Sequence, residues 1–434
     1  MNILYIIPGS GDNFYCGNCL RDSEYVSAIR DRGHQVIKIP MYLPLFSDEN
    51  DRKDTPLFYN AISIYLKQLY PILRKAPPWF DRLIGSKPLL KLAAKMAGST
   101  RARGLGELTV SMLMGERGVQ KRELDQMVDW IDEHYMPDVI HLSNALLLGV
   151  AGRIRERIRV PIVCTLQDED VWVDVMKSEF RDRAWELMRE DSKNVDLFIT
   201  VSNYYGDLMK KKLAIPDDKI DRIHLGVCLD DYTSPGGQSA TRSIGFISRM
   251  NHENGFDILV DAFILLKQRN GFDDVKLVLT GGSTGDDTRF IKQNRRRLWK
   301  AGFMEDVDFH EDFVDGGRLE FFNKISVLSV PVRLGEAFGL YLVEAMAAGV
   351  PAVQPSLGAF PEIVGLSDGG LIYSPNNPAE LAESLAKILD DKEMLLEKSL
   401  NARRGVEDHF NIKAQAGELI AHYERLNDTA EYVN

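Results

Sequence analysis

The sequence predicts an α/β fold that consists of two doubly wound domains. Its 434 residues exceed the usual length of a single domain. Short apolar segments that end in turn residues alternate with longer helical patterns along most of the chain, which is typical of parallel sheets covered by helices. A stretch rich in serine, proline and glycine within residues 229–242 interrupts this alternation and divides it into two halves.

The first half opens with a strand at Asn2–Ile7, where a continuous apolar run ends in Pro8 and Gly9. A helix is expected from about Gly17 to Asp31, and Gly33 supplies the kind of residue that often ends a helix. Further strands are expected at 35–39, 138–142, 161–166 and 197–201, with helices at 145–157, 179–191 and 204–212. We therefore assign residues 1–228 to the first domain.

The second half repeats this rhythm after a linker at residues 229–242. Strands are expected at 243–248, 275–280, 307–310, 325–330, 352–353 and 371–372, with helices between them. We assign residues 243–413 to the second domain. The carboxyl-terminal segment, 414–434, is expected to be largely helical and to pack back on the first domain.

A long insertion, at about residues 43–126, interrupts the first sheet. Between 61 and 103 it carries nine basic residues and a single acidic one, together with many aromatic and leucine side chains. This composition suits an anionic membrane surface or an anionic acceptor. The alternative is a pair of solvated basic helices that covers the cleft, because charge runs are often exposed faces.

The composition excludes several classes of protein. A net charge of -11 makes the chain a poor binder of nucleic acid. We find no apolar stretch of the ~18 residues that a transmembrane helix needs, and the first residues do not form a signal peptide. The four cysteines suggest a reducing compartment, so we expect a cytoplasmic protein, with peripheral contact to the inner face of the membrane through 61–103. Cys16 and Cys19 form a CxxC pair without further zinc ligands, so we expect no metal site.

The segment 331–351, PVRLGEAFGLYLVEAMAAGVP, carries the clearest chemistry. It follows a strand, so it lies at the carboxyl edge of the second sheet, where doubly wound folds bind ligands. Glu336 lies in a turn, and Gly339 allows close approach of a ligand. The amides of Phe338, Gly339 and Leu340 open a helix and suit a phosphate. Glu344 lies further along this helix and can accept hydrogen bonds from two adjacent hydroxyl groups. A nucleotide sugar fits this arrangement, with Glu336 on the sugar and Glu344 on the ribose.

The two glutamates are separated by seven residues and are followed by AMAAGVP at 345–351 and GAFPEIV at 358–364. This pattern resembles the signature of family 4 retaining glycosyltransferases, the group 1 enzymes of the GT-B fold. The resemblance implies two Rossmann-like domains that face a cleft and a nucleotide-diphosphate sugar as donor. It also implies transfer with retention to a glycan, lipid-linked or small-molecule acceptor, as in polysaccharide biosynthesis. Neither a metal nor a cofactor other than the donor substrate is implied.

The family places an arginine and a lysine after the first strand of its second domain. Arg249 stands at the arginine position, where a guanidinium can hold the diphosphate and offset the charge of the leaving group. Asn254 replaces the lysine, and Arg333 could supply the missing positive charge. The alternative for Arg249 is a surface ion pair with Glu253.

The first domain is expected to supply the acceptor side. Gly17 lies near the position of the glycine pair with which the family approaches the donor phosphate. Gln167 replaces a histidine that touches the donor sugar in many members; it can bind a hydroxyl but cannot carry a proton. Asp168 and Asp170 are candidate acceptor contacts, although capping of the next helix is favoured. By analogy with the family, a base would lie near residues 311–314.

Two histidines of the sequence, His141 and His224, are interpreted as buried and hydrogen-bonded residues. Two other functions stay open. The departures at Asn254 and Gln167 fit a catalytically impaired protein that binds nucleotide sugars without transferring them. The same fold also supports other reactions, such as those of an epimerase or a phosphorylase.

Overall fold

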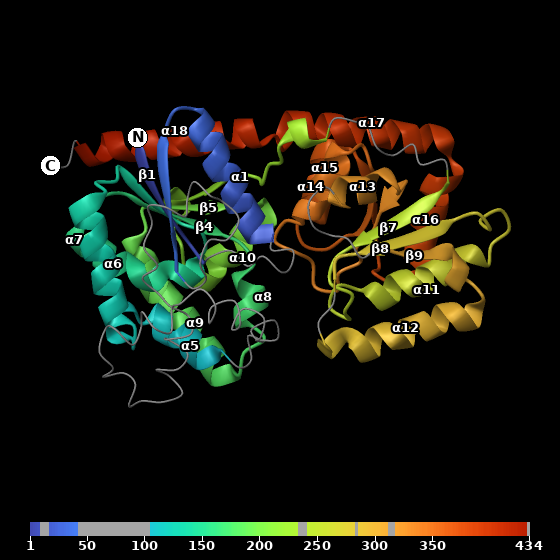
Figure 1. The fold of residues 1–434 in the computed structure, drawn as a ribbon, viewed down its shortest axis with the longest axis horizontal. Coiled ribbons are helices and arrows are strands. Elements are labelled where there is room, and N and C mark those ends of the chain that lie inside the picture. Colours follow the sequence, from blue (N-terminus) through green and yellow to red (C-terminus); the bar gives the residue numbers. More distant parts are fainter. Residues whose placement is uncertain (9–16, 42–104, 233–240, 283–284, 311–316, 432–434) are drawn as a thin grey trace. The chain divides into compact units, whose positions relative to one another are not determined.

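The computed structural model describes residues 1–8, 17–41, 105–232, 241–282, 285–310 and 317–431 (Figure 1). The basic insertion segment at 61–103, Cys16 of the CxxC pair, the proposed base region at 311–314 and most of the linker lie outside these residues. The described chain divides into two compact units. Unit 1 comprises Met1–Val201, Tyr205–Ile223 and Ala416–Asn434, and unit 2 comprises Ser202–Tyr204 and His224–Gln415.

Unit 1 is built on a parallel sheet with the strand order β2-β1-β3-β4-β5-β6. The strands are β1 (Asn2–Ile7), β2 (Gln35–Pro40), β3 (Val139–Leu142), β4 (Ile162–Leu166), β5 (Leu197–Thr200) and β6 (Ile220–Arg222). The register pairs Ile6 with Ile39 and with Leu142, so the centre of the sheet is apolar. Most side chains of β1, β3, β4 and β5 are buried on both faces, which explains why their sequences are continuous apolar runs.

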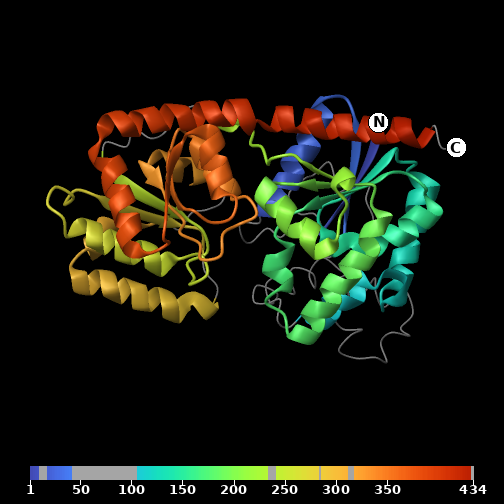
Figure 2. The ribbon, with the colours of Figure 1, turned by 180° about the vertical axis from the view of Figure 1, so that it is seen from behind.

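The helices of this unit connect successive strands or cover the sheet (Figure 2). They are α1 (Gly17–Asp31), α5 (Gly106–Leu113), α6 (Lys121–His134), α7 (Ala151–Arg157), α8 (Glu169–Val173), α9 (Ser178–Asp191), α10 (Asn203–Leu213) and α18 (Ile412–Glu431), with 3-10 turns at Gly115–Arg117, Ala145–Val150, Ser192–Asn194 and Asp217–Lys219. Leu124, Val128 and Ile131 form the buried stripe of α6, as the 3.6-residue period requires. Within α18, Tyr423 is buried in the core of unit 1.

Unit 2 has a second parallel sheet, with the order β12-β11-β10-β7-β8-β9. Its strands are β7 (Ser243–Ile247), β8 (Lys276–Thr280), β9 (Val307–Phe309), β10 (Val327–Leu328), β11 (Ala352–Pro355) and β12 (Gly370–Tyr373). Its helices are α11 (Phe256–Lys267), α12 (Thr288–Ala301), α13 (Gly317–Asn323), α14 (Leu340–Ala347), α15 (Phe360–Ser367), α16 (Pro378–Asp390) and α17 (Lys392–His409), with 3-10 turns at Leu229–Asp231, Gly285–Asp287 and Met304–Asp306. In Figure 1, α11 and α12 lie on one side of the sheet and α14 and α15 on the other.

The two parallel sheets confirm the predicted α/β class, and most predicted strands agree with the structure within one or two residues. Three details of the secondary structure differ. Strand β6 was not expected, and the predicted helix at 145–157 begins as a 3-10 turn. Residues 106–126, the last part of the predicted insertion, form helix α5 and the beginning of helix α6. Unit 1 ends its main part at Ile223, five residues before the predicted boundary at 228.

Candidate functional site

The turn at Gly335 and Glu336 is fixed against the loop that contains Gly358. A Cβ atom on Gly358 would lie 2.5 Å from the backbone nitrogen of Glu336, and one on Gly335 would lie 2.5 Å from the nitrogen of Gly358. The φ angle is +80° at Gly335 and +59° at Gly358, and residues with a side chain adopt such positive angles only at a cost in free energy. The Ala359 amide donates to the Glu336 carbonyl at 3.0 Å. Backbone packing therefore sets the position of Glu336.

The Glu336 carboxylate lies at the amino end of α14, as the sequence predicts. A Cβ atom on Gly339 would lie 3.4 Å from Glu336 Oε2 and 2.9 Å from the ring of Phe360, and Gly339 has a φ of +92°. Helix α14 begins at Leu340, so its first amides lack acceptors within the helix. The Phe338 ring is buried against His224 and Phe410, at centroid distances of 6.0 and 5.9 Å. Glycine here thus permits the carboxylate to approach the helix start.

Glu344 has a different environment from the one expected of a group that contacts ligand. Its side chain is 1% exposed and is ion-paired with Arg318 of α13. The hydroxyl of Tyr232 also donates to Glu344 Oε1 at 3.3 Å. In this structure the Glu344 carboxylate is therefore directed to protein partners inside unit 2.

Arg249 lies directly after β7 and forms a two-point ion pair. Its Nε donates to Asp287 Oδ2 at 2.7 Å and its Nη2 to Oδ1 at 3.0 Å. The partner that the sequence suggested as an alternative, Glu253, does not form this pair. Because Asp287 is buried and Arg249 is about half exposed, the pair holds one edge of the guanidinium in a fixed direction.

Asn254 and Arg333 stabilise the same loop. The Asn254 side-chain amide donates to Ser248 Oγ at 2.8 Å and to the Arg249 carbonyl at 3.0 Å. Arg333 donates to Asp257 at 2.6 Å and to the His252 carbonyl at 2.9 Å. Both side chains thus have structural partners at this edge of the sheet.

In unit 1, Gln167 follows β4 and belongs to a buried polar cluster. Arg21 of α1 donates to the Gln167 side-chain oxygen and, at 2.9 Å, to both the carbonyl and the hydroxyl of Ser143. Arg21 also pairs with Asp22, and these two side chains are 3% and 2% exposed. Ser143 Oγ donates to Asp22 Oδ2 at 2.6 Å. Arg21 therefore connects the ends of β3 and β4 to α1, whose first residue is Gly17.

A second buried carboxylate supports the backbone of Gln167. Glu169 accepts hydrogen bonds from the Gln167 amide at 2.8 Å, the Ala145 amide at 2.8 Å and the Tyr205 hydroxyl at 2.7 Å. Burial raises the pKa of Glu169 to about 7, although these hydrogen bonds favour the charged form. The Gln167 backbone is thus held by a group that titrates near neutral pH.

The two aspartates after Gln167 do not cap α8 as expected. Asp168 occupies the N-cap position with a φ of +59°, but its side chain makes no capping hydrogen bond. Asp170 accepts a hydrogen bond from Tyr205 at 2.9 Å. The favoured prediction of side-chain capping is therefore wrong.

The two histidines are buried and hydrogen-bonded, as predicted. His141 lies between the Tyr423 hydroxyl, at 2.5 Å, and Thr165 Oγ1, at 2.8 Å, and burial lowers its pKa well below the usual value. His224 contacts Glu362 at 2.7 Å. Burial opposes the charge on Glu362, but hydrogen bonds from His224 and Asn203 outweigh it and hold the Glu362 pKa below its usual value.

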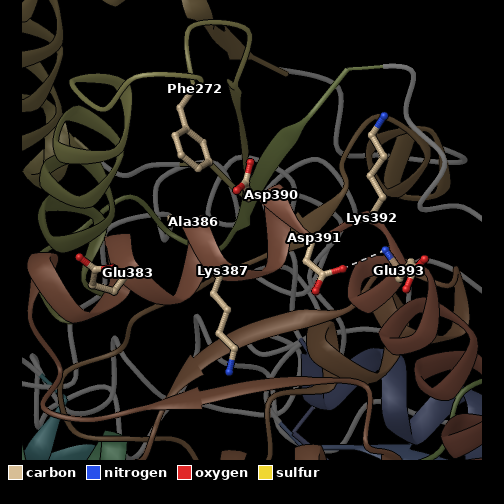
Figure 3. Close-up of a pocket in the computed structure, with 8 residues that line it drawn as sticks. All are labelled: Phe272, Glu383, Ala386, Lys387, Asp390, Asp391, Lys392 and Glu393. Atoms are coloured by element: carbon tan, nitrogen blue, oxygen red, sulfur yellow. Dashed lines mark hydrogen bonds between the residues drawn. The ribbon is translucent and has the colours of Figure 1, made fainter.

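A cavity of about 610 Å³ lies elsewhere on unit 2 (Figure 3). Its lining includes Phe272, which precedes β8, and Asp390 and Asp391 at the end of α16. These positions belong to the amino edge of the sheet, the edge opposite Glu336. We therefore do not assign the cavity to the donor site.

Among the residues that the structure describes, no group of three or more His, Cys, Asp or Glu side chains is placed to hold a metal ion. Within the same part of the chain, the helices are too short or too polar to cross a membrane.

Family models of glycosyltransferases match both halves of the chain. The model "Glycosyltransferase Family 4" matches residues 111–231 and the model "Glycosyl transferases group 1" matches 241–391, which includes Arg249, Glu336 and Glu344. The chain belongs to the family 4, or group 1, glycosyltransferases. The glycosyltransferase is 30% identical over 196 residues to the lipopolysaccharide core biosynthesis mannosyltransferase LpsB of Rhizobium meliloti; this match covers 44% of the chain and about half, 54%, of the relative.

Other similarities extend over more of this glycosyltransferase. It is 26% identical over 318 residues to the D-inositol 3-phosphate glycosyltransferase of Corynebacterium efficiens, covering 68% of the chain and 72% of the relative. The crystal structure of HepE from Anabaena in complex with UDP aligns with a TM-score of 0.69 at 18% identity, over 98% of the chain and 100% of HepE. Sucrose-phosphate synthase from Thermosynechococcus elongatus also aligns with a TM-score of 0.69, at 18% identity, over 99% of both chains. The glycosyltransferase therefore has the GT-B fold.

Sequence reasoning missed several residues that position the candidate site of this glycosyltransferase. They are Arg21, Asp22, Ser143, Glu169, Asp287 and Arg318. Arg21 and Asp22 lie in the middle of a helix, where charged residues usually face water. The signal that could have revealed Asp287 is the preceding GGSTGD stretch, because a glycine-rich turn after a strand commonly lies at the ligand-binding edge.

Proposed function

We propose that this protein transfers a sugar from a nucleotide-diphosphate sugar to an acceptor hydroxyl, with retention of the anomeric configuration and without a metal ion. The observation that carries the proposal is the Glu336 turn. A carboxylate held by backbone packing stands at the start of α14, in a chain whose two halves both match glycosyltransferase models. Such a turn presents amides to phosphate and a carboxylate to sugar hydroxyls.

The donor side belongs to unit 2. Glu336 binds the sugar hydroxyls, and the amides of Phe338, Gly339 and Leu340 receive the diphosphate. Arg249, whose guanidinium is about half exposed, binds the same group, and the loop held by Asn254 and Arg333 supports it. Glu344 binds the ribose once Arg318 moves away from it. In unit 1, Gln167 contributes a hydrogen bond to the substrate. Helix α1 begins at Gly17, near the position of the glycine pair that approaches the donor phosphate in the family.

In the reaction, the bond between the anomeric carbon and the diphosphate oxygen breaks, and the bond to the acceptor oxygen forms on the same face. The acceptor proton passes to an oxygen of the departing diphosphate, so that no protein base is required. Arg249 and the amides of α14 stabilise the negative charge that develops on the leaving group, which is the main catalytic contribution.

The acceptor is a glycan, a lipid-linked group or a small molecule, and the enzyme acts in the cytoplasm. Two relatives bear names that refer to lipopolysaccharide core and to inositol 3-phosphate, which motivates anionic acceptors as the first to test. We further propose that residues 61–103 make peripheral contact with the inner face of the membrane. Deletion of 61–103 should weaken sedimentation with anionic vesicles, and unchanged sedimentation would contradict that contact.

The decisive experiment combines donor screening with a single substitution. A thermal-shift screen over nucleotide sugars, starting with uridine donors because HepE was crystallised with UDP, identifies the donor by its stabilisation. Glu336→Ala should then abolish transfer while circular dichroism stays unchanged. Glu397→Ala, which removes an exposed carboxylate from α17, is the matched control and should retain full turnover. Unchanged turnover in Glu336→Ala would refute the role of this carboxylate.

One observation favours a second function, that of a binding protein without transfer. Asn254 stands where the family has a lysine, and its amide is engaged by Ser248 and the Arg249 carbonyl. Calorimetry that shows donor binding, together with neither transfer nor hydrolysis of a labelled donor, would establish this function. A changed sugar configuration in the recovered donor would instead indicate an epimerase.

A further inference from the structure

Helix α12 (Thr288–Ala301) is strongly cationic in a chain whose net charge is -11. Its 14 residues contain six lysines and arginines and no acidic residue: Arg289, Lys292, Arg295, Arg296, Arg297 and Lys300. The charge of this helix is therefore opposite in sign to the net charge of the whole chain.

The cations are concentrated on the outer face of α12. Asn294 and Leu298 are buried and define the inner face. Arg297, at the border, is ion-paired with Asp261 of α11. The other five cations are exposed, and at 3.6 residues per turn they fall within an arc of about 140°. None of these five forms an ion pair with another described residue in the structure.

Trp299 lies inside the same arc, between the cations. Its side chain is 69% exposed, which is unusual for the largest apolar side chain. The face formed by Arg289, Lys292, Arg295, Arg296, Trp299 and Lys300, which we call the α12 face, thus combines positive charge with an unburied indole. This combination is typical of helices at the boundary between water and lipid, where the indole lies at the level of the headgroups.

Three carboxylates near the α12 face are ion-paired with cations outside that face. Asp261 pairs with Arg297, Asp287 pairs with Arg249, and Asp306 pairs with Lys267 and Lys276. The field of the five exposed cations extends into solvent over about one Debye length, which is ~8 Å at physiological salt. Each exposed cation that reaches an anionic membrane contributes to binding.

We propose that the α12 face docks unit 2 on an anionic lipid surface. The cations contact phosphate headgroups and Trp299 inserts at the interface. An acidic protein or a nucleic acid would satisfy the charges alone, whereas a lipid surface also receives the indole. The proposal uses no residue of the donor site and does not depend on the proposed transferase activity.

The test measures sedimentation of the full chain with vesicles of phosphatidylcholine, with or without phosphatidylglycerol. We expect binding only to the anionic vesicles, and Lys292→Glu with Arg296→Glu should weaken it at least tenfold. The matched control is Lys387→Glu with Arg404→Glu, which makes the same change in net charge at exposed positions on α16 and α17 and should bind as the wild type does. Trp299→Ala should weaken binding and should reduce the quenching of tryptophan emission by brominated lipid.

Three outcomes would overturn the proposal. These are the absence of binding to anionic vesicles, an equal loss of binding in the control pair, and full retention of binding in the α12 variant. Binding of the wild type to an oligonucleotide but not to vesicles would assign the α12 face to a nucleic acid instead. Transfer to a soluble acceptor, measured on the same variants, should stay unchanged, so that failure of this proposal is distinguishable from failure of the proposed activity.

Discussion

The buried pair of Arg21 and Asp22 permits a quantitative prediction. Asp22→Asn removes the charge that compensates Arg21 but preserves the size of the side chain. The two side chains are 3% and 2% exposed, so water does not replace the lost partner. Arg21 keeps its hydrogen bonds to Ser143 and Gln167, which are neutral groups and compensate a full charge only in part.

Removal of one partner from a buried ion pair costs about 3–5 kcal/mol. Both side chains of the pair are almost fully buried, but Ser143 and Gln167 still accept hydrogen bonds from the guanidinium group of Arg21. We therefore expect Asp22→Asn to lower the free energy of unfolding of unit 1 by about 3 kcal/mol. Replacement of both residues, with Arg21→Met and Asp22→Leu, should cost less than the sum of the two single substitutions, because no unpaired charge is left behind.

The assay is urea denaturation followed by circular dichroism, combined with hydrogen exchange of peptides that cover α1 and β3. The control is Asp31→Asn, which removes an exposed carboxylate from the end of the same helix and should change stability by less than about 0.5 kcal/mol. A loss below about 1 kcal/mol in Asp22→Asn, or equal losses in Asp22→Asn and Asp31→Asn, would refute the argument that Arg21 is held by charge compensation.

Three further predictions concern the site and its support. Gly358→Ala places a Cβ atom 2.5 Å from the Glu336 nitrogen at a φ of +59°. This substitution should lower the free energy of unfolding by about 2 kcal/mol or more and weaken donor binding, measured by calorimetry. Unchanged donor affinity would contradict the fixed position of the Glu336 turn. Glu169 has a pKa raised to about 7, so its carboxyl group stabilises the fold below pH ~4.3, and this contribution is lost as pH rises through 7. Relative to Glu169→Gln, the wild type should therefore lose roughly 3 kcal/mol over this range in urea titrations, and parallel pH profiles would refute the assignment. Asn254→Ala removes two hydrogen bonds, to Ser248 and to the Arg249 carbonyl. It should lower the free energy of unfolding by about 1 kcal/mol and accelerate hydrogen exchange of the 249–255 loop. Unaltered exchange would contradict the role of Asn254 in stabilising that loop.

The strands were predictable because they are covered on both faces. Continuous apolar runs such as Asn2–Ile7 leave little choice of structure once turn residues end them. Strand β6, Ile220–Arg222, was missed because it is an edge strand of three residues with two exposed charged side chains. Its pairing with β5 depends on backbone hydrogen bonds, which the side-chain pattern does not reveal.

The Glu336 turn was predictable because its glycines and its position after a strand are local features. The partners of the predicted residues were not. Arg249 meets Asp287, 38 residues later, and Gln167 meets Arg21, 146 residues earlier. Such pairs arise only when parallel strands bring distant loops to the same sheet edge, so a single sequence does not reveal them.

The last helix has a consequence for biosynthesis. Residues from Ala416 onward belong to unit 1, and Tyr423 completes its core beside His141. The ribosome synthesises this segment after all of unit 2. The hydrophobic core of unit 1 is therefore completed only after the residues from Ala416 onward have been synthesised. Domains commonly fold in the order of their synthesis. In this chain, the unit that emerges first is the one that matures last, and a nascent chain arrested before residue 416 should remain a client of chaperones.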